Sequence, residues 1–153
     1  MQKHPPFLLH FLAMFFMVSF LINLNGIVQL VQSWNWLLAA GYTPHPVYVV
    51  FKSTFIGLAS LFAAASLWLY IPFSARFSQI LAVIVFIWFW LDRLLLTRNP
   101  LSFEHHAFPL LISLLILLFV VVSSWLLEPY MKYRANRLSP ADEDGEQDEQ
   151  NLP

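Results

Sequence analysis

Four long apolar runs divide this chain, and proline or polar residues separate each run from the next. A helix needs about 20 apolar residues to cross a hydrocarbon core of about 30 Å, because each residue advances it by about 1.5 Å. The runs are continuously apolar, which favours helices over the alternating strands of a membrane barrel. The pattern therefore predicts an all-α integral membrane protein, an antiparallel four-helix transmembrane bundle with short loops. The predicted spans cover about residues 7–31, 47–70, 77–96 and 107–127.

Prolines mark several of the predicted span boundaries. Pro5 and Pro6 precede the first span, and Pro72 ends the second. Pro109 is expected in the first turn of the fourth span, where its missing N–H is harmless. The first run is longer than the apolar part of a secretory signal, and no small-residue cleavage site follows it. We therefore expect an uncleaved first span and one membrane domain over residues 1–138.

Composition supports this class of protein and limits its chemistry. Of the 153 residues, 59% are hydrophobic and 11% are charged, whereas about a quarter are charged in a typical soluble domain. The chain has no cysteine, which excludes disulfides and thiolate metal sites. Residues 141–153 hold six of the nine acidic residues and none of the eight basic ones. Residues 139–153 are therefore predicted to be a disordered acidic cytoplasmic tail, either a solubilising terminus or a contact for a basic partner.

Orientation follows from the positions of lysine and arginine around the spans. One side of the predicted bundle carries Lys3, Arg76, Lys132, Arg134 and Arg137. The other side carries Lys52, Arg93 and Arg98. Basic residues favour the cytoplasmic side of a membrane. We therefore expect the protein in a cytoplasmic (plasma) membrane, with its N- and C-termini in the cytoplasm.

Three amides lie on one face of the first span. Asn25, Gln29 and Gln32 follow the spacing i, i+4, i+7, which places their side chains along a single helical stripe. An amide in hydrocarbon needs a hydrogen-bond partner, so this stripe is expected to face other helices and not lipid. It could serve as packing contacts or as the polar lining of a ligand site or an ion path.

Small residues form a second stripe, on the second span. Ser53, Gly57, Ser60 and Ala64 repeat at i, i+4, i+7, i+11. Such a stripe lets another helix backbone approach closely. The sequence predicts a helix-packing surface here and leaves open whether the neighbouring helix belongs to this chain or to another copy.

Opposite charges are predicted to meet in the outer half of the bundle. Lys52 lies near the start of the second span and Asp92 near the end of the third, so antiparallel spans place them at similar depth. Ionisable groups at that depth are usually paired. We predict that Lys52 and Asp92 lie close together, near Glu104 and the amide stripe, as an outer-half polar cluster. In the alternative arrangement, Asp92 pairs within the 93–106 loop or Lys52 extends to the interface.

Histidines supply the remaining candidate chemistry. His45, His105 and His106 are expected on the outer side, where they could join Glu104 around a metal ion or in proton transfer. Adjacent histidines on a regular backbone point in different directions, and interfacial histidines are usually solvated. The sequence therefore predicts no metal site and no cofactor.

The favoured function is a non-enzymatic structural or accessory subunit that acts through helix–helix association. Its expected partners are the lipid bilayer and another membrane protein or a second copy, and no nucleic-acid surface or catalytic motif is present. The alternative is a binding or transport module for a lipid, quinone or small amphiphile, with an outward-facing pocket. An enzyme would require the histidines to converge with Glu104. A tightly packed outer half would favour the subunit. The binding module would be favoured by an apolar outer pocket on which polar groups and tryptophans converge. The residues expected to line it are Asn25, Gln29, Gln32, Lys52, Asp92, Trp34, Trp36, Trp88 and Trp90.

Overall fold

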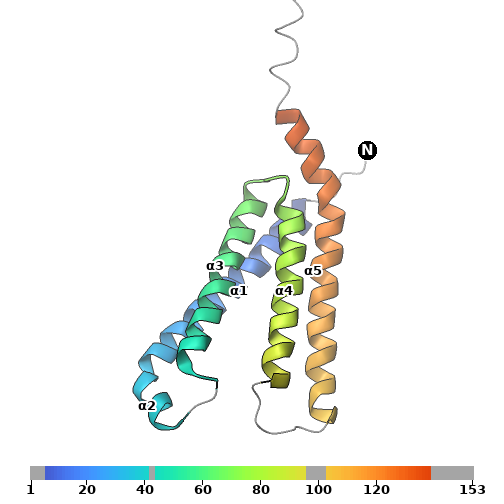
Figure 1. Cartoon of the computed structure of the whole chain (residues 1–153). Coiled ribbons are helices and arrows are strands. Elements are labelled where there is room, and N and C mark those ends of the chain that lie inside the picture. The colour runs from blue at the N-terminus through green and yellow to red at the C-terminus, as the bar shows by residue number, and fades with distance from the viewer. Residues whose placement is uncertain (1–5, 42–43, 96–102, 139–153) are drawn as a thin grey trace, which may run out of the picture.

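Every secondary-structure element in the described part of the chain is a helix. The computed structural model describes residues 6–41, 44–95 and 103–138, with side chains described for 7–41, 44–95 and 107–133. The elements in these ranges are α1 (Pro6–Gln32), α2 (Trp34–Ala39), α3 (Pro46–Trp68), α4 (Ser74–Leu95) and α5 (Phe103–Leu138) (Figure 1). Four of them, α1, α3, α4 and α5, are long and apolar enough to cross a membrane. The sequence prediction of four such helices is confirmed.

The ends of the helices differ from the predicted span boundaries in two places. The short helix α2 occupies part of what was expected to be an outer loop. Helix α5 begins at Phe103, so Pro109 lies inside it and not in its first turn, and Pro129 is a second internal proline. Its 36 residues correspond to about 54 Å at about 1.5 Å per residue. The C-terminal end of α5 accordingly extends beyond the turn that connects α3 with α4 (Figure 1).

A tight turn closes α3 and starts α4. Tyr70 N–H donates to the Leu67 carbonyl at 3.1 Å, and Ile71 N–H donates to the Ser66 carbonyl at 3.0 Å. This pair of bonds is the Schellman ending of a helix, whose left-handed position is usually glycine. Tyr70 occupies that position with φ of 55°, a conformation that costs an L-residue about 1–2 kcal/mol. We call the end of the molecule that contains this turn the turn end, and the opposite end the α2 end.

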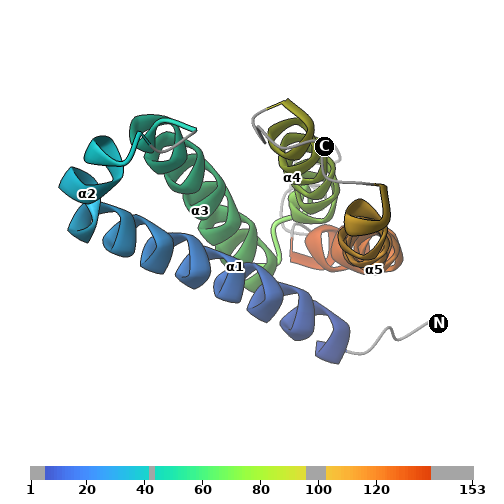
Figure 2. The same cartoon turned by 90° about the horizontal axis from the view of Figure 1, so that it is seen from below.

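The helices are arranged as two pairs. Helix α1 packs most extensively on α3, and α4 packs most extensively on α5. Figure 2 shows α1 running obliquely, near α5 at its N-terminal end and far from α5 where it reaches α2. The near end is marked by Phe11 and Phe119, whose ring centroids lie 5.6 Å apart. The two pairs therefore meet at the turn end and diverge toward the α2 end.

The apolar core lies at the turn end. Its buried members come from the N-terminal halves of α1 and α4, the C-terminal half of α3, and the middle and C-terminal half of α5. They are Leu9, Leu12, Ala13, Phe16, Ala63, Ala64, Leu67, Leu81, Val120, Leu127 and Met131. Buried apolar side chains of this kind hold the four long helices together where the pairs meet. The α2 end is less densely packed, and the candidate sites lie toward it.

The small-residue stripe of α3 packs on α1. Ser60 Oγ lies 3.2 Å from Ser19 Oγ, and a Cβ added at Gly57 would lie 3.4 Å from the Cβ of Asn23. Ala64 is fully buried, whereas Ser53 at the other end of the stripe is half-buried. At Gly57 and Ser60 the neighbouring helix therefore belongs to this chain, which the sequence had left open.

Candidate functional site

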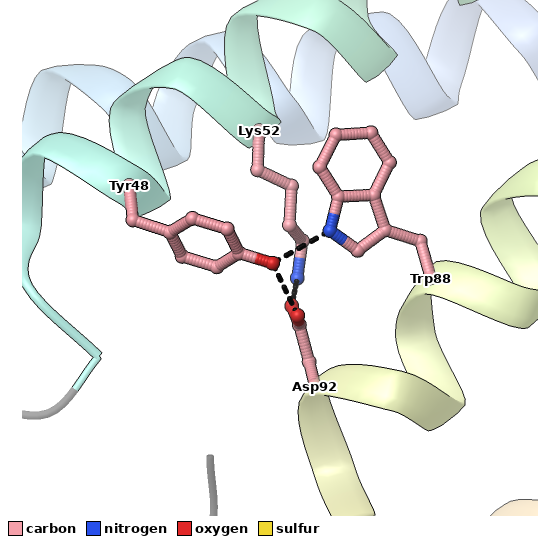
Figure 3. A network of polar contacts seen from close by, with 4 residues as sticks. All are labelled: Tyr48, Lys52, Trp88 and Asp92. Carbon is pink, nitrogen blue, oxygen red and sulfur yellow. Dashed lines mark hydrogen bonds and ion pairs between the residues drawn. The ribbon is translucent and has the colours of Figure 1, made fainter. Parts of the chain in front are cut away.

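Four polar side chains from α3 and α4 form a network near the α2 end. Lys52 forms an ion pair with Asp92 through Nζ and Oδ2, and the Tyr48 hydroxyl donates to Asp92 Oδ1 (Figure 3). Trp88 Nε1 donates to the Tyr48 hydroxyl at 2.6 Å. Both oxygens of the carboxylate therefore have a partner, and the expected proximity of Lys52 and Asp92 is present in the structure. We call these four residues the Lys52–Asp92 network.

Helical spacing explains why these four residues converge. Tyr48 precedes Lys52 by four residues on α3, and Trp88 precedes Asp92 by four residues on α4. Residues at i and i+4 share one helix face, so each helix presents one charged and one neutral polar group to the other. Sequence reasoning identified the charged pair and placed Trp88 only in the aromatic lining of an outer pocket, and it did not recognise Tyr48 and Trp88 as hydrogen-bonding partners of the pair. The matching spacing was the signal that could have found them.

A cavity lies between the two helix pairs. Its volume is about 460 Å³, and side chains of α1, α3, α4 and α5 line it. The lining is almost entirely apolar, mainly phenylalanine and branched aliphatic residues. On α4, the lining extends toward the α2 end as far as Phe89. Phe89 precedes Asp92 by three residues, and this separation corresponds to about 4.5 Å along the helix. The cavity therefore ends close to the Lys52–Asp92 network without including it.

Three serines are the polar groups in the cavity lining. Ser19 of α1 and Ser60 of α3 contact each other through their hydroxyls at 3.2 Å. Ser113 of α5 accepts a hydrogen bond from Trp90 Nε1 at 3.1 Å and donates to the Leu110 carbonyl at 3.0 Å. One hydroxyl hydrogen joins Ser19 to Ser60, so the pair retains a second hydrogen that can be donated. The Ser19–Ser60 pair is thus the hydrogen-bonding point of an otherwise apolar cavity.

The amide stripe of α1 does not join the Lys52–Asp92 network. Asn25, Gln29 and Gln32 are all exposed, contrary to the expectation that they would face other helices of the bundle. Asn23 lies on the α3-facing side of α1, where Gly57 approaches it. Asn25 is two residues further, about 200° around the helix, so its stripe points away from α3. The outer-half polar cluster is therefore separated, with the ion pair and the amides on different surfaces.

The histidine candidates are not brought together in the described residues. His45 Nδ1 accepts a hydrogen bond from Val47 N–H at 3.3 Å and caps the start of α3, with Pro46 as the first helical residue. The side chains of Glu104, His105 and His106 lie outside the described set. Within that set, no group of three or more histidine, aspartate or glutamate side chains has the arrangement of a metal site.

A second ionic group joins α4 to α5 at the turn end. Glu128 Oε1 lies 2.8 Å from Arg76 Nη2 and 2.9 Å from Lys132 Nζ. We call these three residues the Glu128 cluster. Sequence reasoning did not single it out, although the i, i+4 spacing of Glu128 and Lys132 was visible. The cluster connects α5 to the first turns of α4.

Three buried serines lie in α4 and α5, close in sequence to the residues of the Glu128 cluster. Ser74 and Ser78 of α4 and Ser124 of α5 are fully buried. Their hydroxyls have no hydrogen-bond partner within the described residues. Small side chains bring helix backbones together in apolar surroundings. We interpret this group as a packing contact, because Ser74 and Ser78 form a small-residue stripe of the same kind as that of α3.

Comparison with models of protein families, with curated proteins and with solved structures finds no match to this chain. The cavity, the Lys52–Asp92 network and the exposed amides are therefore the features that bear on its function.

Proposed function

We propose that this chain is an integral membrane protein whose four long helices cross the bilayer in antiparallel order, with both termini in the cytoplasm. The length and composition of the helices support the transmembrane placement. Arg76 and Lys132 lie at the turn end, and the order of the spans in the sequence assigns Lys3, Arg134 and Arg137 to that same side, which supports a cytoplasmic turn end. The α2 end then faces the opposite side of the membrane.

Within that placement we propose that the protein is a binding module for a chain-like apolar ligand. The observation that carries this proposal is the cavity of about 460 Å³ between the helix pairs. Pockets for small molecules typically enclose about 300–1,000 Å³ and are mostly apolar. Apolar walls favour a ligand that loses little hydration on entry, such as a lipid acyl chain or an isoprenoid chain.

The polar groups of the lining limit the chemistry of the ligand further. The described residues of the lining supply serine hydroxyls and no charged side chain, so among them a charged group of the ligand would remain unpaired. The spare hydrogen of the Ser19–Ser60 pair suits a neutral acceptor. A carbonyl oxygen, as in an ester or a quinone, has that property. The ligand class we propose is a hydrophobic molecule with one neutral carbonyl near the middle of the membrane.

The cavity favours this function over the accessory subunit that the sequence first suggested. A subunit that acts only by helix packing would not need an open space between its own helix pairs. Within the part of the chain that the structure describes, no acid, base or paired nucleophile lines the cavity, so binding without chemistry suits these residues better than catalysis does. Helix–helix association is a separate property of the chain, and it concerns the exposed amides of α1.

The test fills the cavity from a position that tolerates a larger side chain. Ile116 lines the cavity from α5 and is partly exposed, whereas neighbouring Leu115 is similarly exposed and lies outside the lining. The protein is purified in a mild detergent, and native mass spectrometry with lipid extraction measures the bound hydrophobic molecules. We expect Ile116→Trp to lower the amount bound per protein by at least about tenfold and Leu115→Trp to leave it unchanged, since only the first substitution occupies the cavity. Equal binding by both variants, or no bound molecule in the unaltered protein, would overturn the proposal.

A further inference from the structure

The exposed face of α1 carries polar groups that no part of the described chain covers. The side chains of Asn25, Gln29 and Gln32 are exposed and have no hydrogen-bond partner among the described residues. Each amide offers two donor hydrogens and an acceptor oxygen. In the transmembrane placement proposed above, Asn25 lies about 10 Å along the helix from its α2 end, below the membrane surface. An amide facing lipid at that depth lacks the partners that water would provide.

The amides belong to a longer stripe with the spacing of a helix–helix seam. Val18, Ile22, Asn25, Gln29 and Gln32 are separated by four, three, four and three residues, and all five are exposed. Alternating steps of four and three residues keep the five side chains on one face of the helix, which is the pattern of helix–helix contact surfaces. Gly26 adjoins this seam, and a Cβ added there would meet nothing within 4 Å. Among the described residues, nothing therefore blocks the approach of a partner helix at Gly26.

We propose that this face of α1 binds the same face of a second copy of the chain, across a two-fold axis along the membrane normal. Two copies inserted in the same orientation bring their α1 helices together in the same direction. Because α1 is oblique, the two helices cross, and the seam residues near the crossing point approach their own counterparts. Asn25 then faces Asn25 of the second copy, and Gln29 faces Gln29. An amide is complementary to an identical amide because each can donate to the other, and this self-complementarity selects a second copy as the occupant.

This contact is independent of the cavity. The seam lies on the side of α1 that points away from α3, whereas Ser19 and Phe16 line the cavity from another part of the helix surface. The proposal rests on the transmembrane placement but not on ligand binding. Failure of the dimer would leave the ligand measurement of Ile116→Trp unaffected, and the reverse also holds.

The absence of cysteine from the chain permits a direct test by cross-linking. Ile22→Cys places a single thiol on the seam without removing an amide, and Leu24→Cys places one at a similar depth about 200° around the helix. Both native residues are exposed, so both thiols are accessible. Each variant is oxidised in native membranes, and the product is identified by denaturing electrophoresis and mass spectrometry. We expect a disulfide-linked dimer of about twice 17.8 kDa from Ile22→Cys and little from Leu24→Cys.

A second arm tests whether the amides drive the contact. Asn25→Leu with Gln29→Leu keeps the helix apolar and removes two self-complementary pairs. In bilayers, fluorescence energy transfer between labelled copies should show that the dissociation constant of the dimer rises about threefold for each amide pair lost. The matched control, Val31→Leu, alters an exposed residue off the seam and should have no effect. Equal cross-linking at positions 22 and 24, unchanged dimerisation in the double variant, or cross-links only to a different membrane protein would each overturn the proposal.

Discussion

The Lys52–Asp92 network and the Glu128 cluster each connect two neighbouring helices through one carboxylate, but their surroundings differ. In the network, the side chains of Lys52 and Asp92 are 26% and 18% exposed, and Tyr48 and Trp88 add neutral hydrogen bonds. In the cluster, Glu128 is 18% exposed, while Arg76 and Lys132 are 66% and 58% exposed. The two carboxylates are equally exposed, and the difference lies in their partners: Lys52 is largely covered, whereas Arg76 and Lys132 extend outward.

The location of the apolar core explains this difference. The Glu128 cluster lies at the turn end, where the core already holds α4 against α5 and where α3 also contributes to the core. The network lies at the α2 end, away from the core, where the helix pairs diverge. Polar contacts between α3 and α4 therefore have a larger part in holding the helix pairs together at the α2 end. The comparison predicts that equivalent substitutions will have larger effects there.

Removal of the carboxylate charge from the network should have the largest effect. Breaking a fully buried ion pair costs about 3–5 kcal/mol because the remaining charge is left unpaired. Lys52 and Asp92 are partly exposed, so we expect Asp92→Asn to lower the free energy of unfolding by about 2 kcal/mol. Unfolding of the protein in mixed micelles, followed by helical circular dichroism, measures this loss.

A double substitution separates the unpaired charge from the pair itself. Lys52→Met with Asp92→Leu replaces the ion pair by apolar side chains of similar size, which often leaves stability nearly unchanged. We expect a smaller loss for the double variant than for Asp92→Asn alone. A larger loss in the double variant would show that the ion pair has a net stabilising value that this reasoning underestimates.

Removal of the Tyr48 hydroxyl should have an intermediate effect. Tyr48→Phe leaves Trp88 Nε1 and Asp92 Oδ1 each without its partner, and we expect a loss of about 1 kcal/mol in the same unfolding measurement. Tyr130→Phe is the matched control, because the Tyr130 hydroxyl has no partner within the described residues. If the two variants unfolded alike, the relay from Trp88 through Tyr48 would contribute nothing to stability.

Substitution within the Glu128 cluster should have the smallest effect and the strongest dependence on salt. Glu128→Gln removes both ion pairs, but the cations are exposed and salt screens such charges. We expect a loss of less than half that of Asp92→Asn at low salt and almost none at about 1 M salt, where the screening length is about 3 Å. Lys132→Gln, which removes only the i, i+4 pair, should have a smaller effect still. A salt-independent loss as large as that of Asp92→Asn would show that the comparison between the two ends is wrong.

The sequence predicted the helices more accurately than their contacts. Each predicted span corresponds to one long helix. Counting residues along the predicted antiparallel spans was sufficient to place Lys52 near Asp92. The amide stripe was expected to face other helices of the bundle and is exposed instead. The depth of a residue in a predicted membrane span follows from counting residues along the span. The direction in which its side chain points around the helix depends on the neighbours of that helix.

The sequence by itself determined that four helices are long and apolar enough to cross a membrane, and it determined their approximate ends. Those properties are local, because an apolar run must satisfy its backbone hydrogen bonds within itself. Helices that are apolar on nearly every side carry little information about which face meets a neighbour. Only the tertiary structure decided that α1 is oblique, that its divergence from α5 accompanies a cavity between the helix pairs, and that Asn25 and Gln29 remain uncovered.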